Sequence, residues 1–308
     1  MPIYLTERDV AEFLDMPSAI KALRGAFVAC ARGEATIIPR TRWQFGKRRL
    51  NVMGAGIASQ ARYALKSYGS STYHVLLYSG EGLLAVIEAN LLGQIRTGAA
   101  SAIATEKMAH PDARKVALIG AGRQAHAQAL ALKAIDRLAE LAVFARRRDQ
   151  LEIFCAALAG ELGRPVRAAA SAEEAVAGAG IVVTATNSAT PVLMHAWLKP
   201  GAHVNAMGAN AANRREIEPE IVLRATLLVT DDIAQAKIEA AELIDLASAG
   251  RLDWERVKPL HQIVASPGVA RDSAAITLFK SLGVGLEDVA VASLIYDHAT
   301  ASGRVRPL

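Results

Sequence analysis

The sequence predicts an α/β protein with two domains, one a doubly wound parallel sheet and the other of mixed α+β type. Three observations support this prediction. From residue 113 onward, short apolar runs alternate with helical segments. The first of these runs ends directly at Gly120-Ala121-Gly122. Residues 36–90, in contrast, form several β-rich runs separated by Gly and Ser, with no helical segment between them. A chain of 308 residues is long enough to form two hydrophobic cores.

The first region is expected to begin with helices. Residues 5–33 show apolar side chains at helical spacing, with Thr6 as an N-cap before an acidic first turn and Gly33 as the stop signal. The run YSGEG, residues 78–82, is typical of a hairpin turn between two strands. A helix rich in small residues is predicted over 90–109, where His110-Pro111 ends it.

The second region is expected to form six parallel strands with helices on both faces of the sheet. A helix over 285–303 follows, and Glu287 and Asp288 fit the acidic first turn of such a helix. The tail RVRPL is expected to return to the first domain. We therefore expect a first domain of 1–112 plus about 298–308, and a second, doubly wound domain of 113–297. The predicted strands are 115–120, 141–145, 166–170, 181–186, 203–208 and 227–232.

Composition excludes several classes of protein. The net charge is +5, but the basic residues are scattered and aromatic residues make up only 5% of the chain, so we expect no nucleic-acid partner. No long apolar stretch lacks charges, so no membrane span is expected. Two distant cysteines, Cys30 and Cys155, favour a reducing cytoplasm over a disulfide framework. No histidine pair has metal-ligand spacing, so we expect no metal.

The stretch from Gly120 to Ala125 matches the dinucleotide-binding fingerprint, with alanine in the third small position. The first glycine permits the tight turn, and Gly122 lets backbone N–H groups approach a pyrophosphate at the start of a helix. Because a strand precedes the turn and further strand–helix units follow it, we expect a Rossmann-type domain. Cofactor contacts are expected from Gly120, Gly122, Arg123, Gln124 and Ala125.

The end of the second strand indicates which dinucleotide binds. An acidic residue there usually holds the ribose 2′-hydroxyl, but this chain has Arg146-Arg147-Arg148 and no carboxylate before Asp149. Arginines suit a 2′-phosphate, so NADP(H) is favoured over NAD(H), with Arg146 and Arg147 as the binding residues. The alternative is that one arginine stacks on the adenine and the others are solvated.

The loops after the fourth and fifth strands are expected to face the nicotinamide half of the cofactor, because ligands bind beyond the carboxyl ends of parallel strands. The residues concerned are Thr184, Thr186, Met207 and Gly208, with Asn210 following.

Three basic residues of the first region have apolar or small neighbours. Arg40 follows Pro39, Lys66 lies within the apolar strand RYALKSYG, and Arg96 precedes Thr97 in a run of small residues. Each alone could extend its charged end to water. Together they predict a pocket for a carboxylate, in which arginine binds bidentately and lysine adds charge or transfers a proton.

The whole chain resembles the ornithine cyclodeaminase/mu-crystallin family, which includes ketimine reductases and an archaeal type of alanine dehydrogenase. The resemblance implies a Rossmann domain and a substrate domain that forms a homodimer. It also implies that Arg40, Lys66 and Arg96 bind the substrate carboxylate, that Lys66 transfers a proton, and that Thr97 contacts the cofactor. The stretches that match are PRT with Met53-Gly54 downstream, RYALKSYG, IRTGAAS, LIGAGRQA, VTATNS, HVNAMGANAANRREIE and FKSLGVGLEDVAVA.

One position departs from the ornithine cyclodeaminases, which have aspartate in a Gly-Gly-Asp pattern where this chain has Gly208-Ala209-Asn210. Asparagine cannot act as a general base near neutral pH, although it can orient a substrate amine or a water. We therefore expect an NAD(P)-dependent oxidoreductase that transfers hydride to or from C2 of a small imino or amino acid, such as 1-pyrroline-2-carboxylate. Lys66 and Asn210 are its expected catalytic residues. The alternatives are an ornithine cyclodeaminase, which converts ornithine to proline and ammonia, and a non-catalytic, crystallin-like binding protein.

Overall fold

The computed structural model describes residues 1–69, 71–268, 272–303 and 306–308. The chain forms two compact units, Met1–Ala100 with Gly283–Leu308 and Ser101–Leu282. These bounds differ from the expected ones in two places. The first boundary falls within helix α3 (Asn90–Met108) and not after residue 112. Helix α11 (Gly285–Ala301) belongs wholly to the first unit, because it packs along that unit's sheet and on α2.

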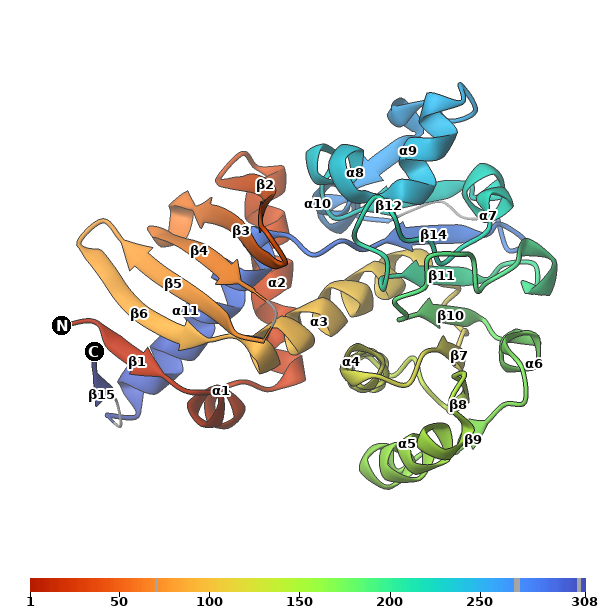
Figure 1. Ribbon diagram of the computed structural model, residues 1–308, viewed down its shortest axis with the longest axis horizontal. Coiled ribbons are helices and arrows are strands. Elements are labelled where there is room, and N and C mark those ends of the chain that lie inside the picture. The colour runs from red at the N-terminus through yellow and green to blue at the C-terminus, as the bar shows by residue number, and fades with distance from the viewer. Residues whose placement is uncertain (70, 269–271, 304–305) are drawn as a thin grey trace. The chain divides into compact units, whose positions relative to one another are not determined.

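The first unit is built on a seven-stranded sheet of order β15-β1-β6-β5-β4-β3-β2 (Figure 1). Strands β1 and β6 pair in parallel, and the other neighbours are antiparallel. The predicted hairpin at 78–82 is confirmed as the turn between β5 and β6, where Ser79 pairs with Gly82. The strands are β1 (Ile3–Leu5), β2 (Ala35–Phe45), β3 (Arg48–Ile57), β4 (Arg62–Tyr68), β5 (Tyr73–Ser79), β6 (Gly82–Glu88) and β15 (Arg306–Pro307), with a 3₁₀ turn η1 (Ala58–Gln60) after β3.

Helices α1 (Glu7–Phe13), α2 (Met16–Ala31) and α11 are packed against this sheet and one another. Thr6 caps α1 as predicted, in a reciprocal capping box with Asp9. The chain tail pairs with β1 as expected, although β1 itself was not predicted from the sequence. A Cβ on Gly285 would overlap the backbone of Gly54, so glycine at this position lets the start of α11 lie directly on β3.

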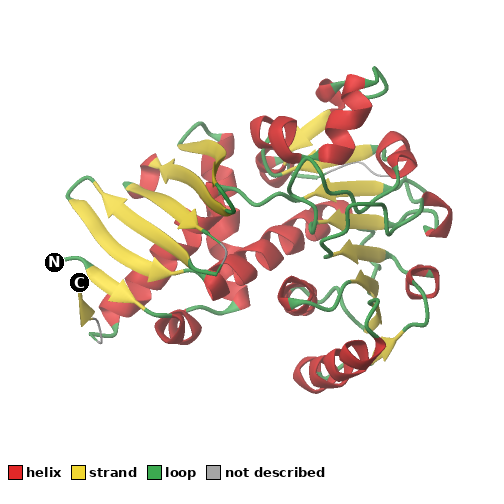
Figure 2. Ribbon diagram, viewed as in Figure 1, coloured by secondary structure: helices red, strands yellow, loops and turns green. Residues whose placement is uncertain are grey.

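The second unit contains an eight-stranded, wholly parallel sheet of order β13-β12-β14-β11-β10-β7-β8-β9 (Figure 2). The chain runs outward from β7 through β8 to β9, then returns to place β10 on the other side of β7. The sheet is therefore doubly wound, and its strand order reverses between β7 and β10. The strands are β7 (Lys115–Ile119), β8 (Glu140–Phe144), β9 (Val166–Ala168), β10 (Ile181–Thr184), β11 (His203–Ala206), β12 (Leu227–Thr230), β13 (Val257–Pro259) and β14 (Thr277–Lys280).

Both faces of this sheet are covered by helices, as alternation along β7 shows. Ala117 and Ile119 belong to one hydrophobic core, with residues of α7, α8 and α9, while Val116 and Leu118 belong to a second core with residues of α4 and α5. The six predicted strands are all present. The helices are α4 (Arg123–Ala134), α5 (Arg148–Leu162), α6 (Ala172–Val176), α7 (Pro219–Arg224), α8 (Ile233–Glu239), α9 (Ala241–Ser248) and α10 (Leu260–Ala265), with 3₁₀ turns η2 (His195–Trp197) and η3 (Trp254–Arg256).

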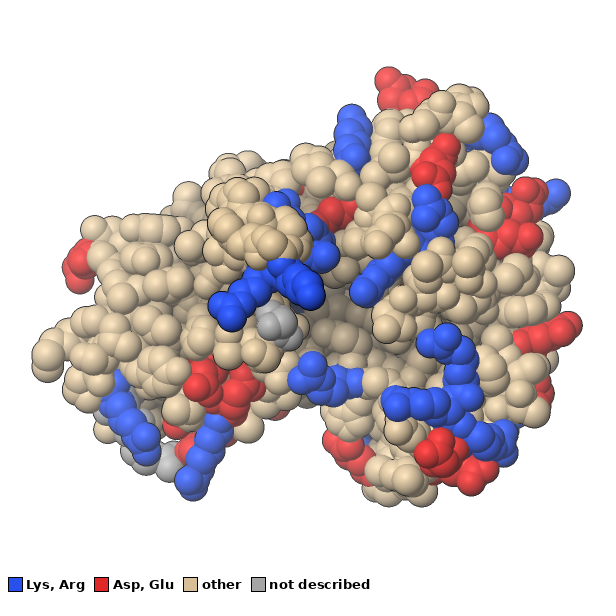
Figure 3. Space-filling view, viewed as in Figure 1, with Lys and Arg blue, Asp and Glu red and all other residues tan. Residues whose placement is uncertain are grey.

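Two surface properties bear on the type of protein. Among the described residues, no helix combines the length and apolar character that crossing a bilayer requires. On the face drawn in Figure 3, lysine and arginine side chains occur in several separate groups, with acidic side chains between some of them.

Candidate active site

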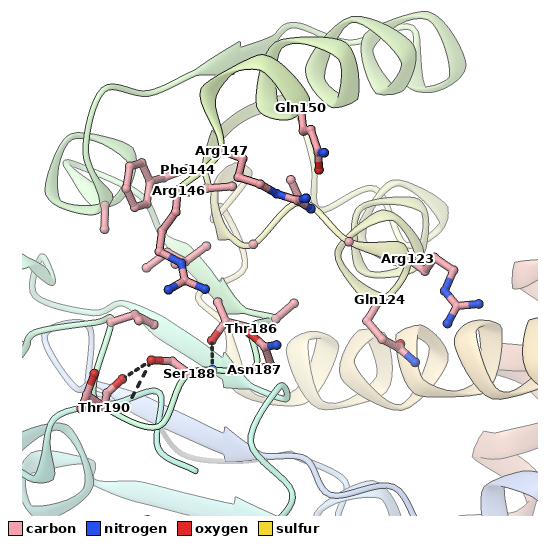
Figure 4. Close-up of a pocket in the computed structure, with 18 residues that line it drawn as sticks. Arg123, Gln124, Phe144, Arg146, Arg147, Gln150, Thr186, Asn187, Ser188 and Thr190 are labelled. Carbon is pink, nitrogen blue, oxygen red and sulfur yellow. Dashed lines mark hydrogen bonds between the residues drawn. The ribbon is translucent and has the colours of Figure 1, made fainter. Parts of the chain in front are cut away.

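A cavity of about 950 Å³ lies in the second unit at the carboxyl ends of β7, β8 and β10 (Figure 4). This is the edge where the strand order reverses, the usual ligand site of a doubly wound sheet. Its lining contains seven of the predicted cofactor residues: Gly120, Gly122, Arg123, Gln124, Arg146, Arg147 and Thr186.

The glycine turn between β7 and α4 fits a pyrophosphate group. Gly120 has φ +121°, and a Cβ there would overlap the carbonyl of Ala185 on the neighbouring loop, so this position requires glycine. At Gly122, nothing lies within 4 Å of the Cβ position, which leaves room beside the backbone. No side chain caps the start of α4, so its first N–H groups are available to an anion. Within the described residues, the buried Gln124 Oε1 in the cavity wall has no hydrogen-bond partner.

The three arginines after β8 have different surroundings. Arg148 donates to Glu152 at 2.8 Å and to the carbonyl of Ala169. Arg146 and Arg147 are exposed, line the cavity, and form no ion pair or hydrogen bond within the described parts of the chain. Figure 4 shows both side chains extending from the end of β8 into the cavity, whereas Arg123 points away from it. Two guanidinium groups are thus available for an anion at this end of the cavity.

Other predicted cofactor residues lie outside the cavity lining, and their roles stay predictions. Ala125 and Met207 pack in the hydrophobic core beside β7. Thr97 is buried in α3, where its hydroxyl donates to the carbonyl of Gly93 at 2.7 Å. Asn210 is half-buried in the loop after β11. Thr184 and Gly208 both donate to the carboxylate of Glu216.

Glu216 was not identified from the sequence as a site residue. Its side chain is fully buried and accepts five hydrogen bonds, from groups at the ends of β10 and β11. In the sequence, Glu216 lies in the charged stretch ANRREIE, where an acidic residue is normally expected on the surface.

The first unit brings together the three predicted cations, and all three are buried. Pro39 interrupts the pairing of β2 with β3, and Arg40 follows at this irregularity with its side chain turned inward. Arg40 Nη2 donates to the carbonyl of Gly283 at 2.7 Å. Lys66 in β4 lies between Met53 and Val75 of the neighbouring strands, on the buried side of the sheet.

Two carboxylates from the first turn of α11 complete this cluster. Lys66 Nζ donates to Asp288 Oδ1 at 2.7 Å, and Arg96 Nη1 donates to Glu287 Oε2 at 2.7 Å. Arg96 Nε lies 3.4 Å from the same Asp288 oxygen. The expectation of an acidic first turn is confirmed, but the sequence did not reveal that these carboxylates pair with Lys66 and Arg96.

The electrostatics of the cluster lower the proton affinity of Lys66. Burial lowers the pKa of Lys66 to about 8, and the positive charges of Arg96 and Arg40 act in the same direction, while Asp288 opposes them. A lysine with such a pKa can both hold and release a proton near neutral pH. Arg40, Lys66 and Arg96 lie close enough for their charges to interact, and such a group of buried cations suits the carboxylate of a ligand.

Comparison with known proteins identifies the family of the chain that carries these two sites. The sequence model of the ornithine cyclodeaminase/mu-crystallin family matches residues 2–303. The chain belongs to this family. A relative in the family is the mouse ketimine reductase mu-crystallin, which is 33% identical over 225 residues, covering 72% of this chain and 68% of the mouse protein.

Solved structures of the family agree over nearly the whole chain. A structure of Thermococcus litoralis Δ1-pyrroline-2-carboxylate reductase in complex with NADH and L-proline has a TM-score of 0.95 at 26% identity, covering 99% of this chain and 100% of that one. An archaeal alanine dehydrogenase dimer with bound NAD has a TM-score of 0.91 at 29% identity, covering 100% and 98%. The predicted family and fold class are therefore confirmed.

Proposed function

We propose that the protein is an NAD(P)-dependent oxidoreductase that reduces a small 2-imino acid at C2, or oxidises the corresponding amino acid. A cyclic imine such as 1-pyrroline-2-carboxylate is the preferred candidate substrate. The observation that supports this most strongly is the buried cluster of Arg40, Lys66 and Arg96, three interacting cations of the type that binds a carboxylate. The glycine-turn cavity of the second unit supplies the matching cofactor site.

The residues of the first unit bind and protonate the substrate. Arg40 and Arg96 hold the substrate carboxylate, and their own hydrogen bonds to Gly283 and Glu287 fix their guanidinium groups beforehand. Lys66, with its pKa of about 8, delivers a proton to the imine nitrogen directly or through a water. Asp288 then stays beside the neutral amine and favours its reprotonation. Asn210 hydrogen-bonds the substrate nitrogen or the far end of the substrate.

The glycine turn, the start of α4 and the two arginines after β8 fit a nicotinamide dinucleotide. Such a cofactor, when bound, supplies the hydride for C2 of the substrate. Arg146 and Arg147 favour NADP(H) over NAD(H), because two guanidinium groups at the end of β8 can bind a 2′-phosphate. Arg146→Ala with Arg147→Ala should weaken NADPH binding at least ~10-fold and leave NADH binding nearly unchanged. Equal losses for the two cofactors would contradict the preference.

The enzyme is also proposed to act as a homodimer in the cytoplasm. Six exposed large apolar side chains lie on neighbouring strands β2, β3 and β4, and one of them, Leu65, is adjacent in sequence to the buried Lys66. An apolar sheet face of this kind is typical of a subunit interface, and a second copy of the chain is the proposed partner. The six residues are Ile38, Trp43, Phe45, Leu50, Tyr63 and Leu65.

The decisive experiment follows oxidation of NADPH and NADH by purified protein with 1-pyrroline-2-carboxylate, 1-piperideine-2-carboxylate, and pyruvate plus amine. Parallel samples contain ornithine and NAD and are assayed for proline and ammonia. Turnover of a cyclic imine without proline formation is expected. Proline from ornithine would support the rival cyclodeaminase, and cofactor binding without any turnover would support a binding protein.

Replacement of Lys66 tests whether this residue of the cluster carries out the proposed proton transfer. Lys66→Ala should abolish turnover while leaving cofactor affinity nearly intact, because Lys66 pairs with Asp288 of the first unit and the cofactor cavity lies in the second unit. Lys21→Ala, at an exposed position of α2, is the matched control and should retain full activity. Retained turnover in Lys66→Ala would refute the assigned role.

A further inference from the structure

Glu216 is a carboxylate that lies fully inside the second unit, among neutral hydrogen-bond donors. Its Oε1 accepts from the Thr186 backbone N–H at 2.6 Å and from the Thr186 hydroxyl at 2.8 Å. Its Oε2 accepts from the N–H groups of Gly208 at 2.6 Å and Ala209 at 3.0 Å, and from the Thr184 hydroxyl at 3.1 Å. Burying a carboxylate in this way is costly unless its oxygens are well satisfied, so five donors around one side chain indicate a specific role.

The donors come from two separate loops. Thr184 and Thr186 belong to the end of β10 and its loop, whereas Gly208 and Ala209 belong to the loop after β11. The two loops also touch directly, since a Cβ on Gly208 would overlap the backbone of Thr186. The carboxylate of Glu216 thus links two neighbouring loops, and Gly208 makes their close approach possible.

A buried ion pair, Glu242 with Lys280, also contacts Glu216 and the loop after β11. The backbone N–H of Glu216 donates to Glu242 Oε1 of α9 at 3.0 Å. Lys280, at the end of β14, lies 3.2 Å from Glu242 and also donates to the carbonyl of Ala209 at 2.7 Å. The loop that leads to Asn210 is therefore fixed on its N–H side by Glu216 and on its carbonyl side by Lys280.

These two loops lie on one side of the strand-order reversal. The loops after β7 and β8, with the glycine turn and Arg146 and Arg147, lie on the other side and suit the ADP-ribose half of a dinucleotide. Because a dinucleotide extends across the reversal, the loops after β10 and β11 receive its nicotinamide half. Thr186, which Glu216 holds by two hydrogen bonds, is part of the cavity wall.

We propose that Glu216 is a positioning residue that sets the loops after β10 and β11 for the nicotinamide half of the cofactor, without touching cofactor or substrate. The inference rests on the proposed function, because it assumes a nicotinamide dinucleotide in the cavity. It predicts that loss of the carboxylate impairs binding of the nicotinamide half selectively and leaves the ADP-ribose half in place. In Glu216→Gln, an NH₂ group replaces one acceptor oxygen and faces donors of the loops.

The test measures dissociation constants for NADH and for ADP-ribose by calorimetry and compares the two. The same pair of measurements is made with their 2′-phosphorylated forms. In Glu216→Gln, the affinity for the whole dinucleotide should fall at least ~10-fold, while the affinity for the ADP-ribose form changes less than ~3-fold. Glu218→Gln is the matched control, because Glu218 is two residues away and its carboxylate accepts from the His195 N–H at 2.8 Å, and from none of the five donors to Glu216 in the described structure. It should leave both affinities unchanged.

The outcomes separate this inference from the proposed function. Equal changes for NADH and ADP-ribose in folded Glu216→Gln, or a wild-type protein that binds NADH no more tightly than ADP-ribose, would overturn the inference. Normal NADH binding without turnover of any imine would reject the proposed function and leave this test valid. If Glu216→Gln does not melt cooperatively, Thr184→Val removes one buried donor to Glu216 outside the cavity lining. The ratio of the two affinities should then fall ~3-fold, and an unchanged ratio would again overturn the inference.

Discussion

Replacing Asp288 by asparagine tests whether Lys66 delivers the proton to the substrate nitrogen. Asp288 Oδ1 lies 2.7 Å from Lys66 Nζ, and both groups are buried. Burial lowers the pKa of Lys66 to about 8, and the negative charge of Asp288 prevents a larger decrease. Removing an opposite charge at such a distance lowers the pKa of a lysine by a further ~1 to 3 units.

This change predicts a measurable shift in the pH profile of imine reduction. If protonated Lys66 is the donor, kcat/KM stays constant below a pH of about 8 and declines above it. In Asp288→Asn, the decline begins ~1 to 3 pH units lower. With a decrease of ~2 units, the protonated fraction of Lys66 near pH 7.5 falls from about three quarters to about 3%, which lowers the rate ~25-fold.

The assay measures initial rates of reduced-cofactor oxidation by 1-pyrroline-2-carboxylate from about pH 5 to pH 10 in both proteins. The titration of the substrate itself cancels, because it is the same for both proteins. Glu287→Gln is the control, since Glu287 pairs with Arg96 and makes no ion pair with Lys66 in the described structure. It should weaken substrate binding and shift the midpoint less than Asp288→Asn does. Identical midpoints in wild type and Asp288→Asn would refute the assignment of Lys66 as the proton donor.

Four further predictions follow from individual positions. Because the pKa of Lys66 is lower in the folded than in the unfolded chain, the unfolding free energy should rise with pH by about 2 kcal/mol between pH 7 and 9.5, and Lys66→Met should abolish this rise in denaturant titrations. Gly120→Ala should abolish dinucleotide binding in calorimetry and lower the melting temperature, because its Cβ would overlap Ala185; tight binding would show that the turn can adapt. Asn210→Asp supplies a general base, so proline should appear from ornithine, and its absence would show that this residue alone does not separate the two reactions. If the protein forms the proposed homodimer, Leu65→Lys should convert it to a monomer in light scattering, whereas a persistent dimer would place the interface elsewhere.

The sequence predicted the parts of the fold that have strong local signals. The glycine turn and the apolar strands around it follow from periodicity and residue type. Strand β14 was missed, although it lies between β11 and β12, because its four residues TLFK end in a charged side chain. Lys280 is buried there with Glu242 of α9 and the carbonyl of Ala209 as partners, which the local sequence does not show.

The sequence identified the basic residues of the candidate site but not the carboxylates that pair with them. An aspartate in the first turn of a helix already has a local explanation, so nothing in the sequence linked Asp288 to a lysine 222 residues earlier. Glu216 was missed for a similar reason, because its acceptor role depends on two loops that approach each other only in the folded sheet. Residue types thus show which charged side chains have unusual neighbours in the sequence, whereas only the fold shows which of these side chains pair.

The order of segments along the chain has a consequence for how the protein is made. Lys66 and Arg96 precede the entire second unit, whereas the carboxylates that neutralise them follow it on α11. During synthesis the ribosome therefore releases these buried cations nearly two hundred residues before their partners, as the separation of 191 residues between Arg96 and Glu287 shows. A nascent chain cannot close the first unit until α11 emerges, so a chain that ends before α11 leaves the cluster's positive charges without Glu287 and Asp288. The cluster thereby makes synthesis of α11 a condition for a stable first unit.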